Sequence, residues 1–460
     1  MILPEFIRQF ISLKTGVAGI AILFFLIGLS IFAATAIPLE SFKQWNNPNY
    51  WIKYPKAAMP SWTNLFAPAK EPEHLILRNA AIRKGLDEGI STLNYSYKFA
   101  FNYDFFPSDF MINYAVQYGA TPPLVDVELS RPDGNSFAII SSSLPSPQGQ
   151  NYVFRDTVFS TENEIQDNLR SYVDKFSYDV DITRPQVMLF SALDKASVLK
   201  GVYTLNISFS FFDEHDKVLN SEFILGGKVY GLLGTDELRH DLSIGILWGT
   251  PVALFIGLSV AIVSTFIGLF YGLVAAYKGK RIEPIMMTIV QIVINIPVLF
   301  ILIILAITIG RSLFLIVGFF ILFGWIGMAL ISRSMGLQIK NYPYVEAAKL
   351  MGESDIRIIF RHIIPQLLPF AFATIALSVP TAILGESGLS FIGLGDPTIP
   401  TWGVILHDAQ SANAAARGMW WWILPPGLMI GITSVSFVLI SRGLESIVNP
   451  KMKNLRIKQL

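Results

Sequence analysis

Six apolar stretches divide the chain, and each is long enough for a helix to cross the hydrocarbon core of a bilayer, which takes roughly 20 residues. Their approximate bounds are 15–37, 244–277, 285–309, 313–331, 367–389 and 422–440. A long polar segment separates the first stretch from the second, and a short charged segment separates the fourth from the fifth. The pattern predicts a helical membrane protein with six spans.

The first apolar stretch has two interpretations. Arg8 and Lys14 precede it, and the sequence AATA at Ala33 to Ala36 resembles a signal-peptidase site. The apolar run is longer than the usual core of a cleaved signal, which has about 7 to 15 residues. We therefore prefer an uncleaved membrane anchor to a signal peptide that is removed.

Basic residues cluster on one side of the membrane if every stretch crosses once. The clusters are Arg8 and Lys14; Lys278, Lys280 and Arg281; Lys349, Arg357 and Arg361; and Lys451, Lys453, Arg456 and Lys458. Because Lys and Arg are enriched in cytoplasmic loops, these clusters predict that both termini are cytoplasmic. Residues 39–243 are then extracytoplasmic, and residues 449–460 form a cytoplasmic tail.

The long polar segment predicts a β-rich domain at residues 39–231. Apolar and polar residues alternate strictly in LNYSYKFAFNY, which begins at Leu93, and in YTLNISFSFF, which begins at Tyr203. This period of two is typical of a strand with one buried face. VDVELSRPDGNSFAII, which begins at Val125, predicts two strands around a Pro-Asp-Gly turn. A sandwich of sheets is the simplest arrangement of such strands.

The composition supports a membrane protein and removes several kinds of chemistry. Of the 460 residues, 52% are hydrophobic and 15% are charged, with a mean hydropathy of +0.49, which is too apolar for an ordinary soluble domain. A net charge of +1 gives no reason to expect a nucleic acid partner. There is no cysteine and the five histidines are scattered, so we expect no metal site and no catalytic residue.

The short charged segment at residues 341–366 has the features of a docking element. It contains Glu346, Ala347 and Ala348, then Gly352, and finally His362, Ile363, Ile364 and Pro365. The spacing predicts a short helix, a sharp turn at Gly352, where the lack of a Cβ atom permits it, and a second amphipathic helix that ends before Pro365. That second helix presents Ile356, Ile359 and Phe360 on one side. A short helix with an apolar stripe suits a groove on a partner protein.

Three stretches carry a resemblance to a known family. EAAKLMGESDIRIIFRHIIP resembles the EAA loop of ABC importer permeases, E-A-A-x3-G-x9-I-x-L-P, and its HIIP ending is similar to the dipeptide/oligopeptide branch. LLGTDELRHDLSIGILWG, residues 232–249, resembles that branch's L-G-T-D-E-L-G-R-D segment, with Arg239 and His240 in place of Gly and Arg. GESGLSFIGLGDPTIPTWG, residues 385–403, resembles the segment after the fifth span. The matches occur in the family's order over about residues 232–452.

The resemblance implies a fold and an activity. The fold would be six transmembrane helices of the ABC type I importer permease kind, with the first helix in residues 1–38 and the permease core at 232–448. The β-rich domain at 39–231 is larger than the short connection that usual members have there. The activity would be to form half of a translocation pathway for peptides, and the chain would not be an enzyme.

The resemblance also implies partners. These would be a second homologous permease subunit, two cytoplasmic ABC ATPase subunits, an extracellular solute-binding protein and the surrounding membrane lipid. We find no phosphate-binding loop of the form G-x-x-x-x-G-K-[ST] in this sequence, so ATP and Mg²⁺ would be bound by the ATPase subunits and no cofactor by this chain. The residues expected to contact an ATPase are Glu346, Ala347, Ala348 and Gly352, followed by Ile356, Phe360 and His362.

Several alternatives stay open at this level. The solute could be an oligosaccharide instead of a peptide, because the residues do not choose between them. The β-rich domain could dock the binding protein, cover the external mouth of the pathway, or have no role in transport. A membrane sensor or receptor with a ligand-binding ectodomain would explain that domain, but not the three ordered matches.

Isolated features within the apolar stretches have structural interpretations. Asn295 and Pro297, like Pro380, could bend helices around a pathway or simply accommodate packing. For Glu386 we expect a hydrogen-bonded structural role. The sequence from Trp420 to Trp422 fits an aromatic belt at the membrane interface.

Overall fold

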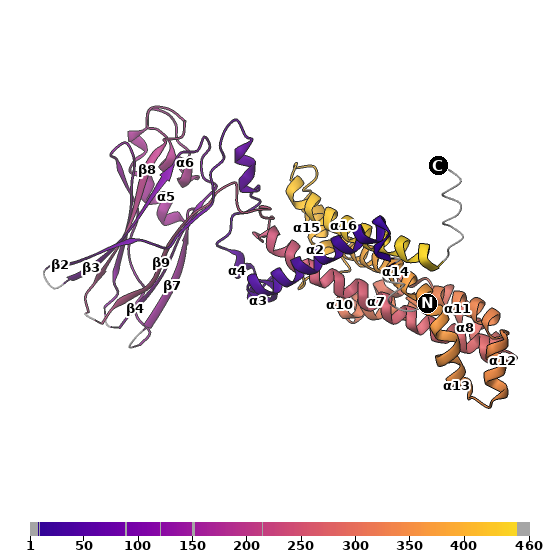
Figure 1. Cartoon of the computed structure of the whole chain (residues 1–460). Coiled ribbons are helices and arrows are strands. Elements are labelled where there is room, and N and C mark those ends of the chain that lie inside the picture. The colour runs from indigo at the N-terminus through magenta and orange to yellow at the C-terminus, as the bar shows by residue number, and fades with distance from the viewer. Residues whose placement is uncertain are drawn as a thin grey trace. The chain divides into compact units, whose positions relative to one another are not determined.

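The computed structural model describes residues 8, 10–87, 90–119, 121–149, 152–213 and 215–448. Within these residues the chain divides into two compact units (Figure 1). One is helical and combines the residues up to Asn46 with those from Ile244 onward. The other, Asn47–Ser243, is rich in strands.

The helical unit contains the long apolar helices that the sequence predicts. Its elements are α2 (Lys14–Ala36), α3 (Leu39–Lys43), α7 (Leu242–Lys278), α8 (Ile282–Ile294), α9 (Val298–Thr308), α10 (Leu313–Gly324), α11 (Ile326–Ile339), α12 (Pro343–Leu350), α13 (Asp355–Ile358), a π-helical turn (Ile359–Ile363), α14 (Ile364–Phe391), α15 (Trp402–Ser411) and α16 (Trp420–Val448). In the described part of the chain, five helical segments are long and apolar enough to cross a membrane. The bent pair α8 and α9 would make a sixth if it is one span.

The third apolar stretch is broken and not a straight span. α8 and α9 meet at an angle of 67°, and the break contains Asn295 and Pro297. Proline has no N–H to donate to the preceding turn, and its ring crowds the carbonyl four residues earlier. The Asn295 side chain donates a hydrogen bond to the Gln291 carbonyl oxygen at 2.6 Å, which satisfies one of the carbonyls that the end of α8 leaves open.

α7 and α11 pack with their backbones unusually close. Gly268 and Gly272 lie one turn apart on α7, and the Ser332 hydroxyl of α11 donates a hydrogen bond to the Gly268 carbonyl oxygen at 3.0 Å. A Cβ atom on Gly272 would lie 2.0 Å from the Ser332 Oγ and 2.2 Å from the Ala329 carbonyl oxygen. Small residues spaced by four are a common way for membrane helices to approach each other, and here they join the second and fourth apolar stretches.

The predicted end of a helix before Pro365 is wrong. The chain continues from α13 through the π-helical turn into α14 without a break. Pro365 lies in the first turn of α14, directly after the π-helical turn. The π-helical turn directly before it widens the backbone, so the proline is accommodated within one continuous helix.

Two further expectations within the apolar helices have clear outcomes. Glu386 is buried and hydrogen-bonded, as expected: the Ser390 hydroxyl donates to its Oε1 at 2.6 Å and the Ser387 hydroxyl to its Oε2 at 3.3 Å.

The predicted aromatic belt at the membrane interface is wrong for two of its three tryptophans. Trp421 and Trp422 are buried in the helical unit and only Trp420 is exposed, because successive residues on a helix point about 100° apart.

The β-rich unit is built on two antiparallel sheets. Its strands are β1 (Leu75–Leu77), β2 (Ala81–Asp87), β3 (Ile90–Phe101), β4 (Phe110–Tyr118), β5 (Leu124–Ser130), β6 (Ser136–Ser143), β7 (Tyr152–Phe159), β8 (Gly201–Phe211) and β9 (Lys217–Leu225). In the described residues the sheet orders are β1-β9-β4-β7 and β2-β3-β8-β5-β6. Short helical segments lie outside the strands. α4 (Pro48–Trp51) and a 3-10 turn (Ser61–Leu65) precede β1, and α5 (Asn163–Arg170), a 3-10 turn (Val173–Lys175) and α6 (Pro185–Phe190) lie between β7 and β8.

The alternating stretches form the strands that the sequence predicts. β3 and β8 pair along their whole length, with Tyr97 opposite Leu205 and Phe101 opposite Gly201. The alternate apolar residues of β8, from Tyr203 to Phe211, are fully buried in the core. β5 and β6 enclose the predicted turn, in which Gly134 has a φ of +81°. The β-rich domain is therefore confirmed as a two-sheet core.

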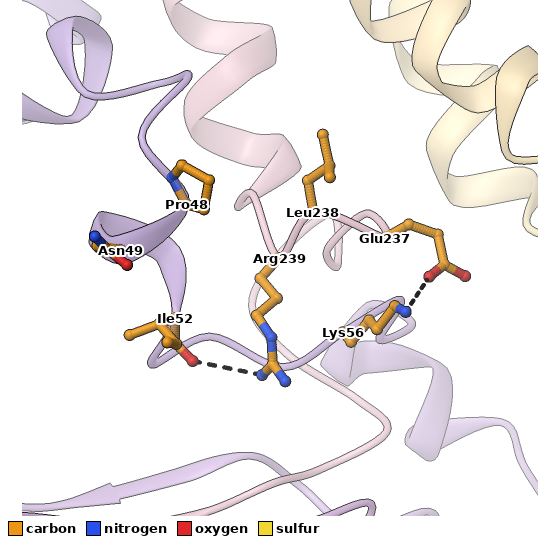
Figure 2. A pocket seen from close by; sticks show the side chains of 7 residues that line it. All are labelled: Pro48, Asn49, Ile52, Lys56, Glu237, Leu238 and Arg239. Carbon is orange, nitrogen blue, oxygen red and sulfur yellow. Dashed lines mark hydrogen bonds and ion pairs between the residues drawn. The ribbon is translucent and has the colours of Figure 1, made fainter. Parts of the chain in front are cut away.

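Arg239 occupies a backbone conformation that favours glycine. Its φ is +71°, at the position where the family pattern has Gly. Its side chain lines a hollow of about 350 Å³. Figure 2 shows the guanidinium next to Ile52, whose carbonyl oxygen accepts a hydrogen bond from it at 3.5 Å. It also donates to the Tyr54 carbonyl oxygen at 2.6 Å and to Asp109 at 3.4 Å. These bonds offset the left-handed strain of roughly 1–2 kcal/mol and tie the end of the β-rich unit to its beginning.

His74 makes the stability of the β-rich unit depend on pH. It is buried, its Nε2–H donates to the Lys53 carbonyl oxygen at 2.9 Å, and its ring packs edge-on against Tyr230. Burial lowers its pKa from 6.5 to about 4; Asp109 opposes this shift and Arg239 adds to it. The unfolded chain therefore binds a proton between these values while the folded chain does not, so stability is complete above pH 6.5 and falls toward pH 4.

We expect this histidine to cost the unit about 3 kcal/mol between pH 7 and pH 4. Hydrogen exchange of peptides that contain His74, measured in the full chain and corrected for the intrinsic pH dependence of exchange, checks this. His74→Gln should flatten the pH dependence, whereas His215→Gln, at an exposed histidine, should leave it intact. An equally steep loss of protection in His74→Gln would contradict the assignment.

Candidate functional site

The charged segment forms a compact projection at one end of the helical unit. Figure 1 shows α12 and α13 at this end of the unit. Within the described residues, no group of three or more His, Asp and Glu side chains could hold a metal ion. The region instead presents a surface that could bind another protein. The packing and the polar contacts of α12 and α13 determine the shape of this surface.

α12 is fixed by one buried face. Val345 and Ala348, three residues apart, are buried in one apolar cluster that also contains Leu269 and Leu273 of α7. Residues at this spacing lie on the same side of a helix, so the intervening Glu346 and Ala347 point outward and are exposed.

Gly352 ends α12 in a Schellman motif. The Gly352 N–H donates to the Lys349 carbonyl oxygen at 3.1 Å, and the Glu353 N–H donates to the Ala348 carbonyl oxygen at 3.2 Å. This pair of bonds forms only if the first residue after the C-cap of the helix is left-handed. That residue is Gly352, and its φ is +82°. A glycine is needed here for its backbone, since a Cβ atom would meet nothing within 4 Å.

Large apolar side chains are exposed around this turn. Leu350 is 88% exposed, Met351 77%, Ile356 71% and Phe360 55%. Exposed apolar residues gathered in one place are typical of interaction sites. We call these four residues together with Glu346, Ala347 and Gly352 the docking surface.

Polar contacts hold the docking surface against the apolar helices. Lys278, at the end of α7, forms an ion pair with Asp355 of α13 at 2.7 Å. His362 bonds Glu353 at 2.8 Å, which closes the loop between α12 and the π-helical turn. Lys340 donates to the Ala276 carbonyl oxygen of α7 at 2.8 Å. These contacts tie the surface to α7 at its base.

The structure brings most of the predicted site residues together. Glu346, Ala347, Gly352, Ile356 and Phe360 are exposed, His362 is half-buried and Ala348 is buried. Ala348 thus supports the surface from behind. The predicted stripe of Ile356, Ile359 and Phe360 is wrong for Ile359, which is buried in the core.

Ile359 points inward because of the π-helical turn. The buried pairs Ile358–Ile359 and Ile363–Ile364 are five residues apart, which is the hydrogen-bond spacing of a π-helix and not that of an α-helix. Sequence reasoning also missed Leu350 and Met351. The available signal was two large apolar residues next to the turn glycine, where a solvent-exposed turn is usually polar.

Comparisons with known proteins match the helical unit. The family described as "Binding-protein-dependent transport system inner membrane component" matches residues 264–454. The dipeptide transport system permease protein DppC of Bacillus subtilis (strain 168) is 38% identical over 221 residues, which are 48% of this chain and 68% of that protein. The oligopeptide transport system permease protein OppC of the same organism is 34% identical, over 48% of this chain and 72% of that protein. The oligopeptide transport system permease protein OppC of Escherichia coli (strain K12) is 33% identical, over 47% of this chain and 72% of that protein. The docking surface lies inside the family match and the β-rich unit outside it.

Proposed function

This chain belongs to the family of binding-protein-dependent transport system inner membrane components, and on that premise we propose that it forms half of the pathway of an ATP-driven peptide importer. Peptides are favoured as the solute because the relatives are named as dipeptide and oligopeptide permeases. The chain is a permease subunit, so ATP hydrolysis belongs to separate subunits, which would also bind ATP and Mg²⁺.

The docking surface is the observation that carries the coupling part of the proposal. A rigid helix with an exposed apolar tip and a charged rim suits a groove on a cytoplasmic ATPase. Closure of an ATPase pair on ATP would move α12, and its ties to α7 would transmit that movement to the membrane helices. ATP would thereby select between inward-open and outward-open arrangements, and hydrolysis would reset them.

The proposal includes an arrangement in the membrane. The bent pair α8 and α9 counts as one of six spans, both termini are cytoplasmic, and the β-rich unit is extracytoplasmic. The permease core spans 232–448 and the extracytoplasmic domain 39–231, with residues 449–460, which lie outside the described residues, as a cytoplasmic tail. The partners are a second homologous permease, two ABC ATPase subunits and a solute-binding protein, which the β-rich unit would meet at the external mouth.

Uptake by a reconstituted transporter tests this function. We expect proteoliposomes that contain the chain, its second permease, its ATPases and the binding protein to accumulate a labelled dipeptide when ATP is supplied. Gly352→Arg should reduce uptake at least about tenfold, because a left-handed L-residue costs roughly 1–2 kcal/mol and distorts the docking surface. Gly352→Asn is the matched control, since Asn tolerates this conformation.

The possible outcomes separate the alternatives. Uptake of an oligosaccharide in place of the dipeptide would overturn the solute and keep the importer. Equal uptake by wild type and Gly352→Arg would place the coupling elsewhere. A wild-type chain that associates with no ATPase would favour a membrane sensor.

A further inference from the structure

A hollow with an excess of positive charge adjoins the docking surface and shares Glu346 and Leu350 with it. Its volume is about 910 Å³, and it is lined by the turn after α7 and by the segment from Lys340 through α12. Four lysines line it, Lys278, Lys280, Lys340 and Lys349, against two carboxylates, Glu346 and Asp355. The walls therefore carry two more positive than negative charges.

The lysines differ in what already occupies their ammonium groups. Lys278 is paired with Asp355 at 2.7 Å, and Lys340 donates to the Ala276 carbonyl oxygen at 2.8 Å. Lys280 and Lys349 are exposed and form no ion pair with any described residue. Two cations without an ion pair to a described residue thus line the hollow, one from the turn after α7 and one from α12.

The turn that carries Lys280 has a fixed shape. Gly279 and Lys280 both have positive φ values, +55° and +46°, and the Gly279 carbonyl oxygen accepts from Ile282 and Glu283 at the start of α8. A left-handed Lys is uncommon and is kept only where its surroundings hold it. The ammonium of Lys280 is therefore presented from an ordered turn.

An apolar stripe begins directly after this turn. Ile282, Ile285, Ile289 and Ile292 of α8 are all exposed, and their spacing of three to four residues puts them on one face of the helix. On a membrane helix, an exposed apolar face of this kind suits acyl chains. A basic turn at the head of this apolar stripe matches an amphiphile whose anionic group lies above its hydrocarbon.

We propose that this hollow binds a phosphate group that has no cation attached to it, with Lys280 and Lys349 as its principal ligands. Phosphate suits the site because ammonium groups attract it as point charges, and basic pockets on the cytoplasmic side of membrane helices take anionic headgroups. The phosphate comes either from the headgroup of an acidic phospholipid or from a free phosphate in solution. The stripe on α8 favours the phospholipid, and the experiment below separates the two.

Binding to the purified full chain tests the proposal without any partner subunit. The probes are dihexanoyl phosphatidylglycerol, the corresponding phosphatidylcholine, and inorganic phosphate, each titrated against the protein in a neutral detergent by native mass spectrometry. Since each lysine attracts the anionic headgroup with one full charge, Lys280→Gln with Lys349→Gln should weaken phosphatidylglycerol binding about tenfold or more.

Two further variants separate loss of the site from a general loss of positive charge and from damage to the fold. Lys43→Gln with Lys84→Gln removes the same charge at exposed lysines outside the hollow, and should leave binding unchanged. Glu346→Gln removes a negative charge from the hollow and should tighten binding severalfold, a gain that a damaged fold could not produce.

Each outcome supports or overturns phosphate binding in this hollow. Phosphatidylglycerol binding that inorganic phosphate does not displace supports the headgroup, whereas displacement by phosphate supports a free anion at the same site. Equal binding of the two phospholipids would overturn the proposal. So would equal weakening by the two double lysine variants.

Discussion

Leu350→Asp combined with Ile356→Asp should abolish recovery of the partner ATPase with this chain, while the chain itself folds and inserts normally. Both side chains are more than two thirds exposed, so neither contributes to the core. Burying each in a partner's groove would contribute about 1.5–3 kcal/mol, and a carboxylate there also carries a desolvation cost. The combined loss of affinity is expected to exceed a hundredfold.

Co-purification from membranes, scored with the amount of inserted chain held equal, measures this effect. Leu65→Asp is the matched control, because Leu65 is 81% exposed and lies in the β-rich unit. Recovery of the ATPase at the wild-type level with the double variant would show that the exposed apolar tip is not the contact.

Gly272→Leu should prevent the helical unit from folding. A Cβ atom at this position would already lie 2.0 Å from the Ser332 Oγ, and the second close atom, at 2.2 Å, is a backbone oxygen of α11 that cannot rotate away. The helices would have to separate, which also removes the Ser332 hydrogen bond to Gly268. We expect a loss above about 3 kcal/mol, at the upper end of overpacking effects.

The yield of monodisperse protein in detergent and its melting temperature report this loss. Gly318→Leu provides the comparison, since Gly318 lies in an apolar helix where an added Cβ atom meets nothing within 4 Å. Similar yields and melting temperatures for the two variants would show that α7 and α11 do not depend on their close approach.

The periodic parts of this fold were predictable from local sequence. Strict alternation located β3 and β8, and the long apolar runs located the membrane helices. Sequence does not reveal which strands pair across long distances, such as β1 with β9, because that choice depends on packing between segments far apart in the chain. The close contact of Gly268 and Gly272 with α11 could not be predicted for the same reason: it depends on which helix packs against these glycines.

The candidate site was predictable where a backbone rule decides the structure. A glycine between two short helical patterns indicated the turn at Gly352, and its φ follows from the Schellman motif. The direction of Ile359 was not predictable from a 3.6-residue period, because the π-helical turn inserts extra backbone. Leu350 and Met351 were missed because hydrophobic residues are assumed to be buried until their surroundings are known.

The ties between the docking surface and α7 have a mechanical consequence. α7 is a single helix of 37 residues, which at 1.5 Å per residue is about 55 Å long. Its end is joined to the projection by the Lys278–Asp355 ion pair and by the hydrogen bond from Lys340 to the Ala276 carbonyl oxygen, so we expect the projection and the helix to tilt together. A tilt of about 5° imposed at this end would sweep the opposite end through about 5 Å, enough to open or close a passage without bending any helix.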